Sequence, residues 1–174
     1  MKISASNRIS SFCGALGARR PSPGGGAVAA MAGALGTALI IKVANFTIGS
    51  KRYKRYERQA RSVADKAGRL EGKLEELIKE DAESYKEYSR TKSAVAMKKA
   101  TSCVAAVARL SRDAIKLRAT LERIGNKNLK GDLYAAGLLL NASAKAADNL
   151  VKLNKKYLNC HCEGRSSGLK QSKK

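Results

Sequence analysis

The segment AVAAMAGALGTALIIKVANFTI, residues 27–48, decides the fold. It is apolar on every side, which is typical of a helix that is buried all round or that spans a membrane. Lys42 and Asn45 fall in its second half, and alanine and glycine dominate it, so burial inside a helical protein is favoured over a membrane span. Small residues such as Gly33 and Gly36 allow neighbouring helices to approach closely.

The segments around this core helix predict further helices. Helical spacing of apolar residues indicates helices over residues 4–17, 50–90, 91–124 and 129–158. Only two prolines occur in the 174 residues, and the regular turn signals of a β-sandwich or barrel are missing. We therefore predict an all-α, up-and-down bundle of about five helices around the buried Ala/Gly-rich helix. Residues 1–158 are expected to form this domain and residues 159–174 a basic, disordered tail.

The predicted helix over residues 50–90 carries an apolar seam with steps of three and four residues. The seam residues are Tyr53, Tyr56, Ala60, Val63, Ala67, Leu70, Leu74 and Leu77. The next seam position is Asp81, after which the seam resumes at Tyr85 and Tyr88. A carboxylate in an apolar seam is costly unless it is paired or used, so Asp81 is the most informative residue of this helix. The alternative is that the seam drifts and leaves Asp81 at a solvated edge.

The two later helices have inward faces of the same kind. In the first of them, Ala100, Val104, Val107, Ser111, Ala114, Leu117, Leu121 and Ile124 are expected inside. In the second, Leu133, Ala136, Leu140, Ser143, Ala147, Leu150 and Leu153 are expected inside. Gly125-Asn126-Lys127-Asn128 separates the two helices, because glycine and asparagine suit the end of a helix.

The charge is strongly positive. The chain has 35 Lys and Arg against 14 Asp and Glu, a formal net charge of +21, and the first 56 residues contain nine bases and no acid. Such an excess attracts polyanions, whether nucleic acid, anionic lipid or a small substrate with several carboxylates. Charge alone does not choose among these, and an ordinary solvated basic surface also fits it.

The four cysteines, Cys13, Cys103, Cys160 and Cys162, fit no disulfide framework. The first residues do not form a leader of secretory type, so we expect a reducing, cytoplasmic setting. Cys160-His161-Cys162 suggests a metal site, but a four-ligand site needs a second pair of ligands nearby. We therefore expect incidental thiols and no metal.

Several catalytic classes are excluded by the residues present. There is no Walker motif, and the one histidine, His161, cannot supply a catalytic triad. An acid or base must then be Asp, Glu, Lys or Tyr. The amides of Gly24, Gly25 and Gly26 open the core helix and can either bind an anion or simply allow tight packing.

Three stretches together resemble one family. They are PSPGGGAVAA at residues 21–30 with AGALG at 32–36, VANFTIGSKRY at 43–53, and EDAESY at 80–85. The first two resemble the cyclodeaminase/cyclohydrolase family of folate metabolism, and the third is similar to its acidic-Asp-Ala-Glu-x-aromatic motif. The turn at 125–128 followed by Asp132 is similar to the family's helix-joining turn. The resemblance covers about residues 5–157.

This resemblance implies an all-α homodimer that acts on the one-carbon bridge of tetrahydrofolate. It implies methenyltetrahydrofolate cyclohydrolase activity, in which water opens the cationic methenyl bridge to give 10-formyltetrahydrofolate. The alternative is formiminotetrahydrofolate cyclodeaminase activity, in which ring closure releases ammonia. Outside the family, a non-catalytic basic helical module that binds polyanions remains a hypothesis, although nucleic acid is disfavoured because no recognition helix is identified.

The resemblance also implies a set of site residues. Asp81, Lys51 and Asp132 are the candidate catalytic residues, with Asp81 as general base or as counter-charge to the methenyl cation. Arg19, Arg20 and Arg52 are candidates to hold the carboxylates of a polyglutamate tail. The candidate substrate-binding residues are Pro23, Gly24, Gly25, Gly26, Asn45, Thr47, Gly49, Arg52, Tyr53, Tyr85 and Asn128. No cofactor is expected, because the folate is the substrate.

The chain departs from the family pattern at three places. Gly131 stands where the family has serine, and few residues separate Tyr88 from the helix that starts near Ala94. Lys54, Arg55, Arg58 and Arg61 occupy a part of the long helix that is acidic in the family. These departures bear on substrate preference.

Overall fold

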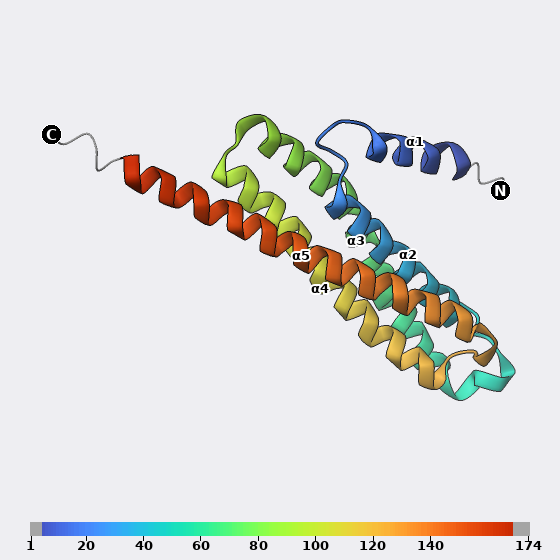
Figure 1. Cartoon of the computed structure of the whole chain (residues 1–174). Helices are drawn as coiled ribbons and strands as arrows, with labels where there is room; N and C mark the ends of the chain where they lie inside the picture. The colour runs from blue at the N-terminus through green and yellow to red at the C-terminus, as the bar shows by residue number, and fades with distance from the viewer. Residues whose placement is uncertain (1–4, 169–174) are drawn as a thin grey trace.

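A computed structural model describes the backbone of residues 5–168 and the side chains of residues 9–159. Within these residues the chain is helical and has no strand, which confirms the predicted all-α class (Figure 1). The elements in order are α1 (Ala5–Gly17), α2 (Gly25–Asn45), the 3-10 helix η1 (Lys51–Tyr56), α3 (Glu57–Thr91), α4 (Ala94–Ile124), the 3-10 helix η2 (Lys127–Leu129) and α5 (Lys130–Gly168).

Helices α2 to α5 form the packed bundle. Helix α2 packs mainly against α3 and α5, and α4 closes the bundle by packing against the same two helices. Helix α1 lies off to one side, and its apolar residue Ile9 is exposed (Figure 1). The bundle therefore has four packed helices, with the first predicted helix outside it.

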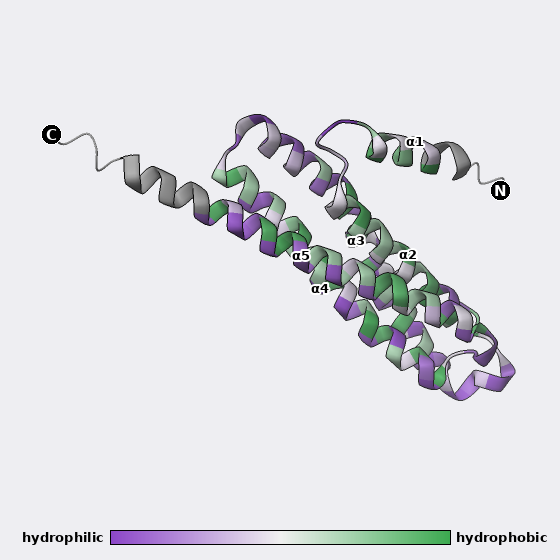
Figure 2. Cartoon of the chain, in the orientation of Figure 1, coloured by the Kyte–Doolittle hydropathy of each residue, from purple (hydrophilic) through white to green (hydrophobic). Residues whose placement is uncertain are grey.

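The core follows from the small residues of α2. A side chain at Gly36 would meet Leu140 Cγ at 2.8 Å and Ala136 O at 3.1 Å, so glycine lets α2 and α5 approach closely. Next to Gly33, the Ser143 hydroxyl donates a hydrogen bond of 2.7 Å to Ala29 O and lies 2.8 Å from Ser111 Oγ. Buried apolar residues come from all four helices, and in Figure 2 residues coloured hydrophobic recur along the length of the bundle.

Helix α2 passes the length and composition test for a membrane span, but 56% of its most apolar window is buried inside the protein. The burial is what a core helix requires. Helix α2 ends at Asn45, three residues before the predicted end. It stops there because Phe46, Thr47 and Ile48 enter a turn that Gly49 completes with φ +76°, a left-handed conformation that suits glycine.

The predicted helix over residues 50–90 is divided into two elements. Its first residues form η1, in which the Tyr53 N–H donates to Ser50 O, and α3 starts only at Glu57. The reason is a tertiary contact, because the Tyr53 hydroxyl accepts a 3.0 Å hydrogen bond from the Lys127 N–H of the α4–α5 turn. The tighter 3-10 turn aims Tyr53 at that partner, where it is buried.

The predicted end of the last helix was also too early. Helix α5 continues to Gly168, so residues 159–168 are helical in part of the predicted tail, and residues 169–174 lie outside the described residues. The side chains of Cys160, His161 and Cys162 lie outside the described residues as well. The boundary of the domain at residue 158 stays a prediction.

Candidate functional site

The candidate site lies where α2 begins. Helices α3, α4 and α5 are each at least ten residues longer than α2, and the α3–α4 hairpin and α5 run past its first turn (Figure 1). Because α2 does not reach the end of its neighbours, a pocket of about 300 Å³ remains above Gly25. It is lined by Pro21, Gly24, Gly25, Gly26, Asp81, Tyr85, Val104, Leu150, Leu153, Asn154 and Tyr157.

Asp81 is confirmed as a buried carboxylate in the seam of α3, with 6% of its surface exposed. It lies against the first turn of α2, and a side chain at Gly26 would overlap the carboxylate. Burial raises the pKa of the Asp81 carboxyl above its ordinary value, and a hydrogen bond from the Ala27 N–H acts in the opposite direction. The start of α2 thus supplies both the space for this carboxylate and a donor to it.

The loop before α2 is tied to the same turn of α3. The Ser22 hydroxyl donates a 2.7 Å hydrogen bond to Ala82 O, next to Asp81. The Ser22–Pro23 peptide bond is cis. Pro23 is half-buried but does not line the pocket, whereas Pro21 does. The glycine run therefore serves to pack a carboxylate onto the helix start, and it also leaves Gly24 and Gly25 open to the pocket.

The mouth of the pocket is aromatic. Tyr85 lies one turn beyond Asp81 on α3 and is 40% exposed, and Tyr157 of α5 is 59% exposed. Tyr85 is the first residue of the predicted seam on α3 that is exposed. Planar rings at the rim of an apolar pocket are suited to stacking on a flat heterocycle.

Asn154 lines the pocket but was not predicted as a site residue, and the same holds for Pro21, Val104, Leu150, Leu153 and Tyr157. Leu153 was expected to be inward, yet Leu153 is 45% exposed and Asn154 is 8% exposed. The signal was present in the spacing, since the three-four alternation through Ser143, Ala147 and Leu150 continues to residue 154 rather than 153.

The charge of the pocket is opposite to that of the chain. Among the described residues that line the pocket, Asp81 is the single Asp, Glu, Lys or Arg, although the chain carries 35 lysines and arginines. A buried carboxylate without a nearby cation favours a positively charged ligand, because such a ligand replaces the lost hydration of the carboxylate.

Of the other predicted site residues, Arg19 and Arg20 are exposed in the loop before α2, and the rest lie at the opposite end of α2, about 30 Å away by the rise of an α-helix. Asn45, Gly49, Lys51, Arg52 and Asn128 are exposed there. Asp132 accepts a 2.9 Å ion-pair contact from Lys42. Within one chain, the structure therefore does not bring these residues together with Asp81.

Thr47 and Tyr53, also predicted to bind substrate, are buried in a joint between the helix ends. The Thr47 hydroxyl donates to Val43 O at 2.7 Å and accepts from the Asn126 N–H at 3.0 Å. The Asn126 side chain donates to Phe46 O at 3.2 Å. These bonds hold the α4–α5 turn against the end of α2, and any role of these residues in binding stays a prediction.

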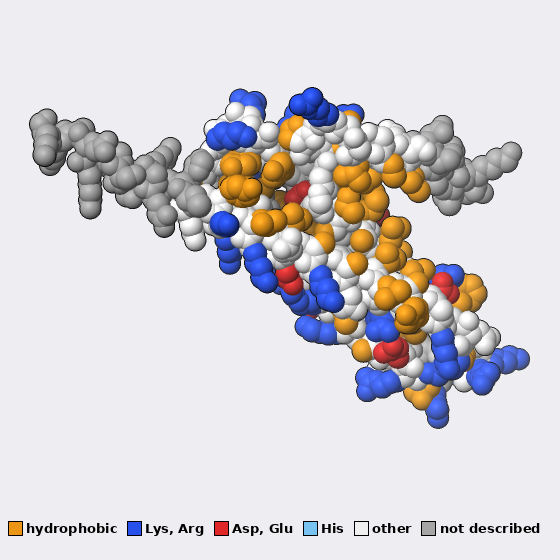
Figure 3. Space-filling view, in the orientation of Figure 1, with side chains coloured by type: hydrophobic (Ala, Val, Ile, Leu, Met, Phe, Trp, Pro, Cys, Tyr) orange, Lys and Arg blue, Asp and Glu red, His pale blue; other side chains and the backbone are white. Residues whose placement is uncertain are grey.

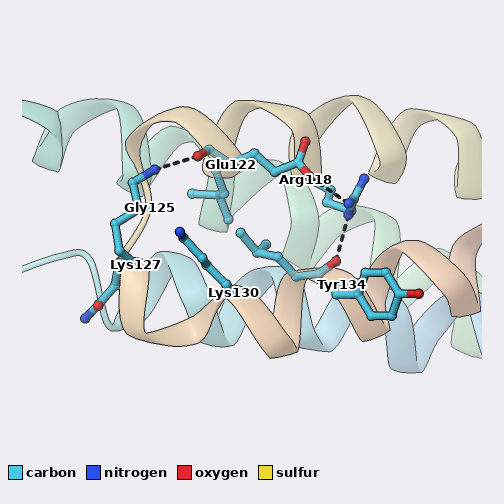
Figure 4. A pocket seen from close by; sticks show the side chains of 9 residues that line it. Arg118, Glu122, Gly125, Lys127, Lys130 and Tyr134 are labelled. Carbon is cyan, nitrogen blue, oxygen red and sulfur yellow. Dashed lines mark hydrogen bonds and ion pairs between the residues drawn. The ribbon is translucent and has the colours of Figure 1, made fainter.

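A larger pocket of about 380 Å³ lies at this end, between α4 and α5 (Figure 4). Two basic side chains that line this pocket already donate hydrogen bonds to other groups of the protein. Arg118 donates to Leu133 O at 2.7 Å and to Glu122 Oε1 at 2.6 Å, and Lys127 Nζ donates to Glu122 O at 2.6 Å. A ligand would have to break these contacts, so the smaller pocket at Asp81 is the better candidate.

The fold and the pocket define an all-helical protein with a single buried carboxylate facing an apolar, aromatic-rimmed pocket. The chain belongs to the formiminotransferase-cyclodeaminase family, whose model matches residues 8–161. It is 31% identical to a methenyltetrahydrofolate cyclohydrolase from Methylorubrum extorquens, over 90% of this chain and 83% of that protein. The crystal structure of a formiminotetrahydrofolate cyclodeaminase from Thermotoga maritima matches with a TM-score of 0.82 and 31% identity, covering 85% of this chain and 78% of that one.

Proposed function

We propose that this protein is an enzyme of folate metabolism that hydrolyses 5,10-methenyltetrahydrofolate to 10-formyltetrahydrofolate. The observation that carries the proposal is the lone carboxylate of Asp81 in a pocket without lysine or arginine, inside a chain of net charge +21. The methenyl bridge is a cation, and Asp81 is its matching counter-charge. The relative in Methylorubrum extorquens, which carries this activity in its name, supports the same assignment.

The chemistry needs few groups. Asp81 accepts a proton from water as the water oxygen bonds to the bridge carbon, which gives a neutral tetrahedral carbon between N5 and N10. Asp81 then gives this proton to N5, the bond between the carbon and N5 breaks with its electron pair going to N5, and the hydroxyl proton is released as the oxygen becomes the carbonyl of the formyl group on N10. One water is consumed and one proton is released overall. A raised pKa makes a carboxylate a better base once it is ionised, which suits Asp81 for the first step.

The experiment is to follow the near-ultraviolet absorbance of methenyltetrahydrofolate with and without the protein, at a pH where spontaneous hydrolysis is slow. We expect loss of absorbance faster than in the protein-free control, in proportion to protein concentration. A rate equal to the control at all protein concentrations would overturn the proposal.

The second candidate function is the cyclodeaminase reaction at the same pocket. It is favoured by the structural relative from Thermotoga maritima, which bears that name. A protonated formimino group is also a cation and would meet Asp81 in the same way. Release of ammonia from 5-formiminotetrahydrofolate distinguishes this reaction from the hydrolysis.

We also propose that the enzyme acts in the cytoplasm without metal or organic cofactor. Water, a base and an electrophilic carbon are sufficient for the hydrolysis, and the folate itself is the substrate. Cys13 is exposed as a free thiol, which suits a reducing compartment. Activity that withstands prolonged treatment with a chelator is the expected result.

We further propose that the enzyme is a homodimer that pairs through α2. Val28, Ala32, Leu35 and Leu39 follow one face of this helix, and Phe46, directly after its end, continues the stripe; Leu35 and Phe46 are each more than half exposed. Hydrophobic side chains gather along α2 in the space-filling view (Figure 3). An exposed apolar stripe of this length is typical of a helix that packs against another protein.

Antiparallel pairing of the apolar stripes of two protomers would also bring the predicted site residues from the two ends of the bundle together. It would place the Lys51 and Asp132 end of one protomer beside the Asp81 pocket of its partner. Mixing an Asp81→Asn protein with an Asp132→Asn protein tests this, because heterodimers then regain one intact site. We expect the mixture to be more active than either variant alone, and a monomer by light scattering would contradict the dimer.

A further inference from the structure

We propose that Asn154 is a second substrate-contacting residue of the Asp81 pocket, whose side-chain amide holds the attacking water and then the oxygen of the tetrahedral carbon. This role rests on the proposed hydrolysis. With this role, Asn154 supplies the second polar group that the hydrolysis needs, beside the base Asp81.

The first argument is position. Asp81 belongs to α3 and Asn154 to α5, two helices that are neighbours of α2 on opposite sides. The start of α2 contacts both walls, since Gly26 lies against Asp81 and Gly25 lies against Leu150. Asn154 is one turn beyond Leu150, so its side chain lies one helical turn above the floor of the pocket. A ligand seated on Asp81 is therefore flanked by Asn154 from α5.

The second argument is burial. Asn154 is 8% exposed, whereas its helix neighbours Leu153 and Tyr157 are 45% and 59% exposed. No buried side-chain nitrogen or oxygen of the described residues lacks a hydrogen-bond partner, so the Asn154 amide is not sealed off without one. The residue is mostly covered and also lines the pocket, where a ligand or the reacting water can hydrogen-bond to its amide.

The third argument is chemical type. The substrate is a cation, so a lysine or arginine on the wall would repel it, and a second carboxylate would raise the pKa of Asp81 further. A neutral amide avoids both effects. Its carbonyl oxygen accepts from the water while Asp81 takes the other proton, and its N–H group donates to the same oxygen once the bond to carbon has formed.

The test compares Asn154→Asp with Asn149→Asp. Asn149 is on the same helix, is exposed and does not line the pocket, so its variant adds the same charge outside the site. For Asn154→Asp we expect kcat to fall about 10- to 100-fold, with KM changed by less than about threefold, because a donor to the transition state is lost. The acid limb of its pH–rate profile should move to higher pH, since the new carboxylate disfavours ionisation of Asp81. Asn149→Asp should leave both kcat and the acid limb of the pH–rate profile unchanged.

Unchanged kcat and an unchanged acid limb in Asn154→Asp would overturn this role while leaving the hydrolysis in place. A fall in kcat at all pH values without a shift of the limb, together with a lower melting temperature, would show a merely structural role and also overturn it. Wild-type protein that fails to accelerate hydrolysis would overturn the proposed function itself, and with it the role of Asn154.

Discussion

The two ends of the bundle differ in how their polar groups are satisfied. At the α4–α5 turn, Thr47 and Tyr53 hydrogen-bond across the joint, and Asp132 pairs with Lys42. At the start of α2, Asp81 is buried beside apolar and aromatic side chains, with no cation in the pocket lining. Polar groups that are paired with each other hold the fold, whereas a buried charge that the protein leaves unneutralised is available for a ligand.

The largest effect should come from Asp81→Asn. We expect kcat for methenyltetrahydrofolate to fall about 10³-fold, within the range measured for the loss of a general base. The folded state should be at least as stable as that of the wild type at neutral pH, because the variant removes a charge that is costly to bury. Steady-state kinetics and thermal unfolding measure the two effects. An Asp81→Asn variant that keeps its activity would show that Asp81 has only a structural role. The two ends of the bundle would then not differ in providing a group for catalysis.

The next effect should come from Gly26→Ala. The added methyl group would overlap the Asp81 carboxylate, so either the carboxylate or the first turn of α2 must move. We expect activity to fall at least tenfold and the free energy of unfolding to fall by about 1–3 kcal/mol. Gly72→Ala is the matched control, because Gly72 lies within α3 with no neighbouring atom in contact, and it should gain up to about 1 kcal/mol. Full activity in Gly26→Ala would show that the site tolerates displacement of the carboxylate.

The pH dependence of activity and of stability tests the difference between the two ends of the bundle further. Burial raises the pKa of Asp81 above 3.8, and the ionised form is the base, so activity should fall about tenfold per pH unit below the raised pKa. The contribution of Asp81 to stability depends on pH in the opposite direction to its contribution to activity. The folded protein binds this proton more tightly than the unfolded chain, so the contribution to stability is full below the ordinary pKa and is lost as the pH rises through the raised one. The difference in melting temperature between wild type and Asp81→Asn should therefore shrink at low pH.

The smallest effect on activity should come from Thr47→Val, in the joint between the end of α2 and the α4–α5 turn. Thr47→Val removes a hydroxyl that donates to Val43 O and accepts from the Asn126 N–H. We expect the free energy of unfolding to fall by about 1–3 kcal/mol, because a partly buried N–H loses its acceptor, with kcat unchanged. Thr120→Val, which removes a single exposed hydroxyl at 3.3 Å from Lys116 O, is the control for stability. A loss of kcat without loss of stability would instead support the predicted role of Thr47 in binding.

The sequence by itself determined the all-α class, the core helix and the buried carboxylate. The reason is that these depend on local periodicity: an Ala/Gly-rich apolar stretch must be covered, and a seam that repeats every three or four residues fixes the position of Asp81. The resemblance of three stretches to one folate-metabolising family also lay in the sequence, and it agrees with the family to which the chain belongs.

Only the tertiary structure decided which residues meet. The pocket exists because α2 begins lower than its three neighbours, and that offset is a property of the packed bundle rather than of any one helix. The same packing placed Lys51, Asn128 and Asp132 about one α2 length away from Asp81 and turned Asn154, rather than Leu153, toward the inside. A difference of one residue rotates a side chain by about 100° around a helix, so sequence spacing alone cannot separate a pocket wall from an exposed rim.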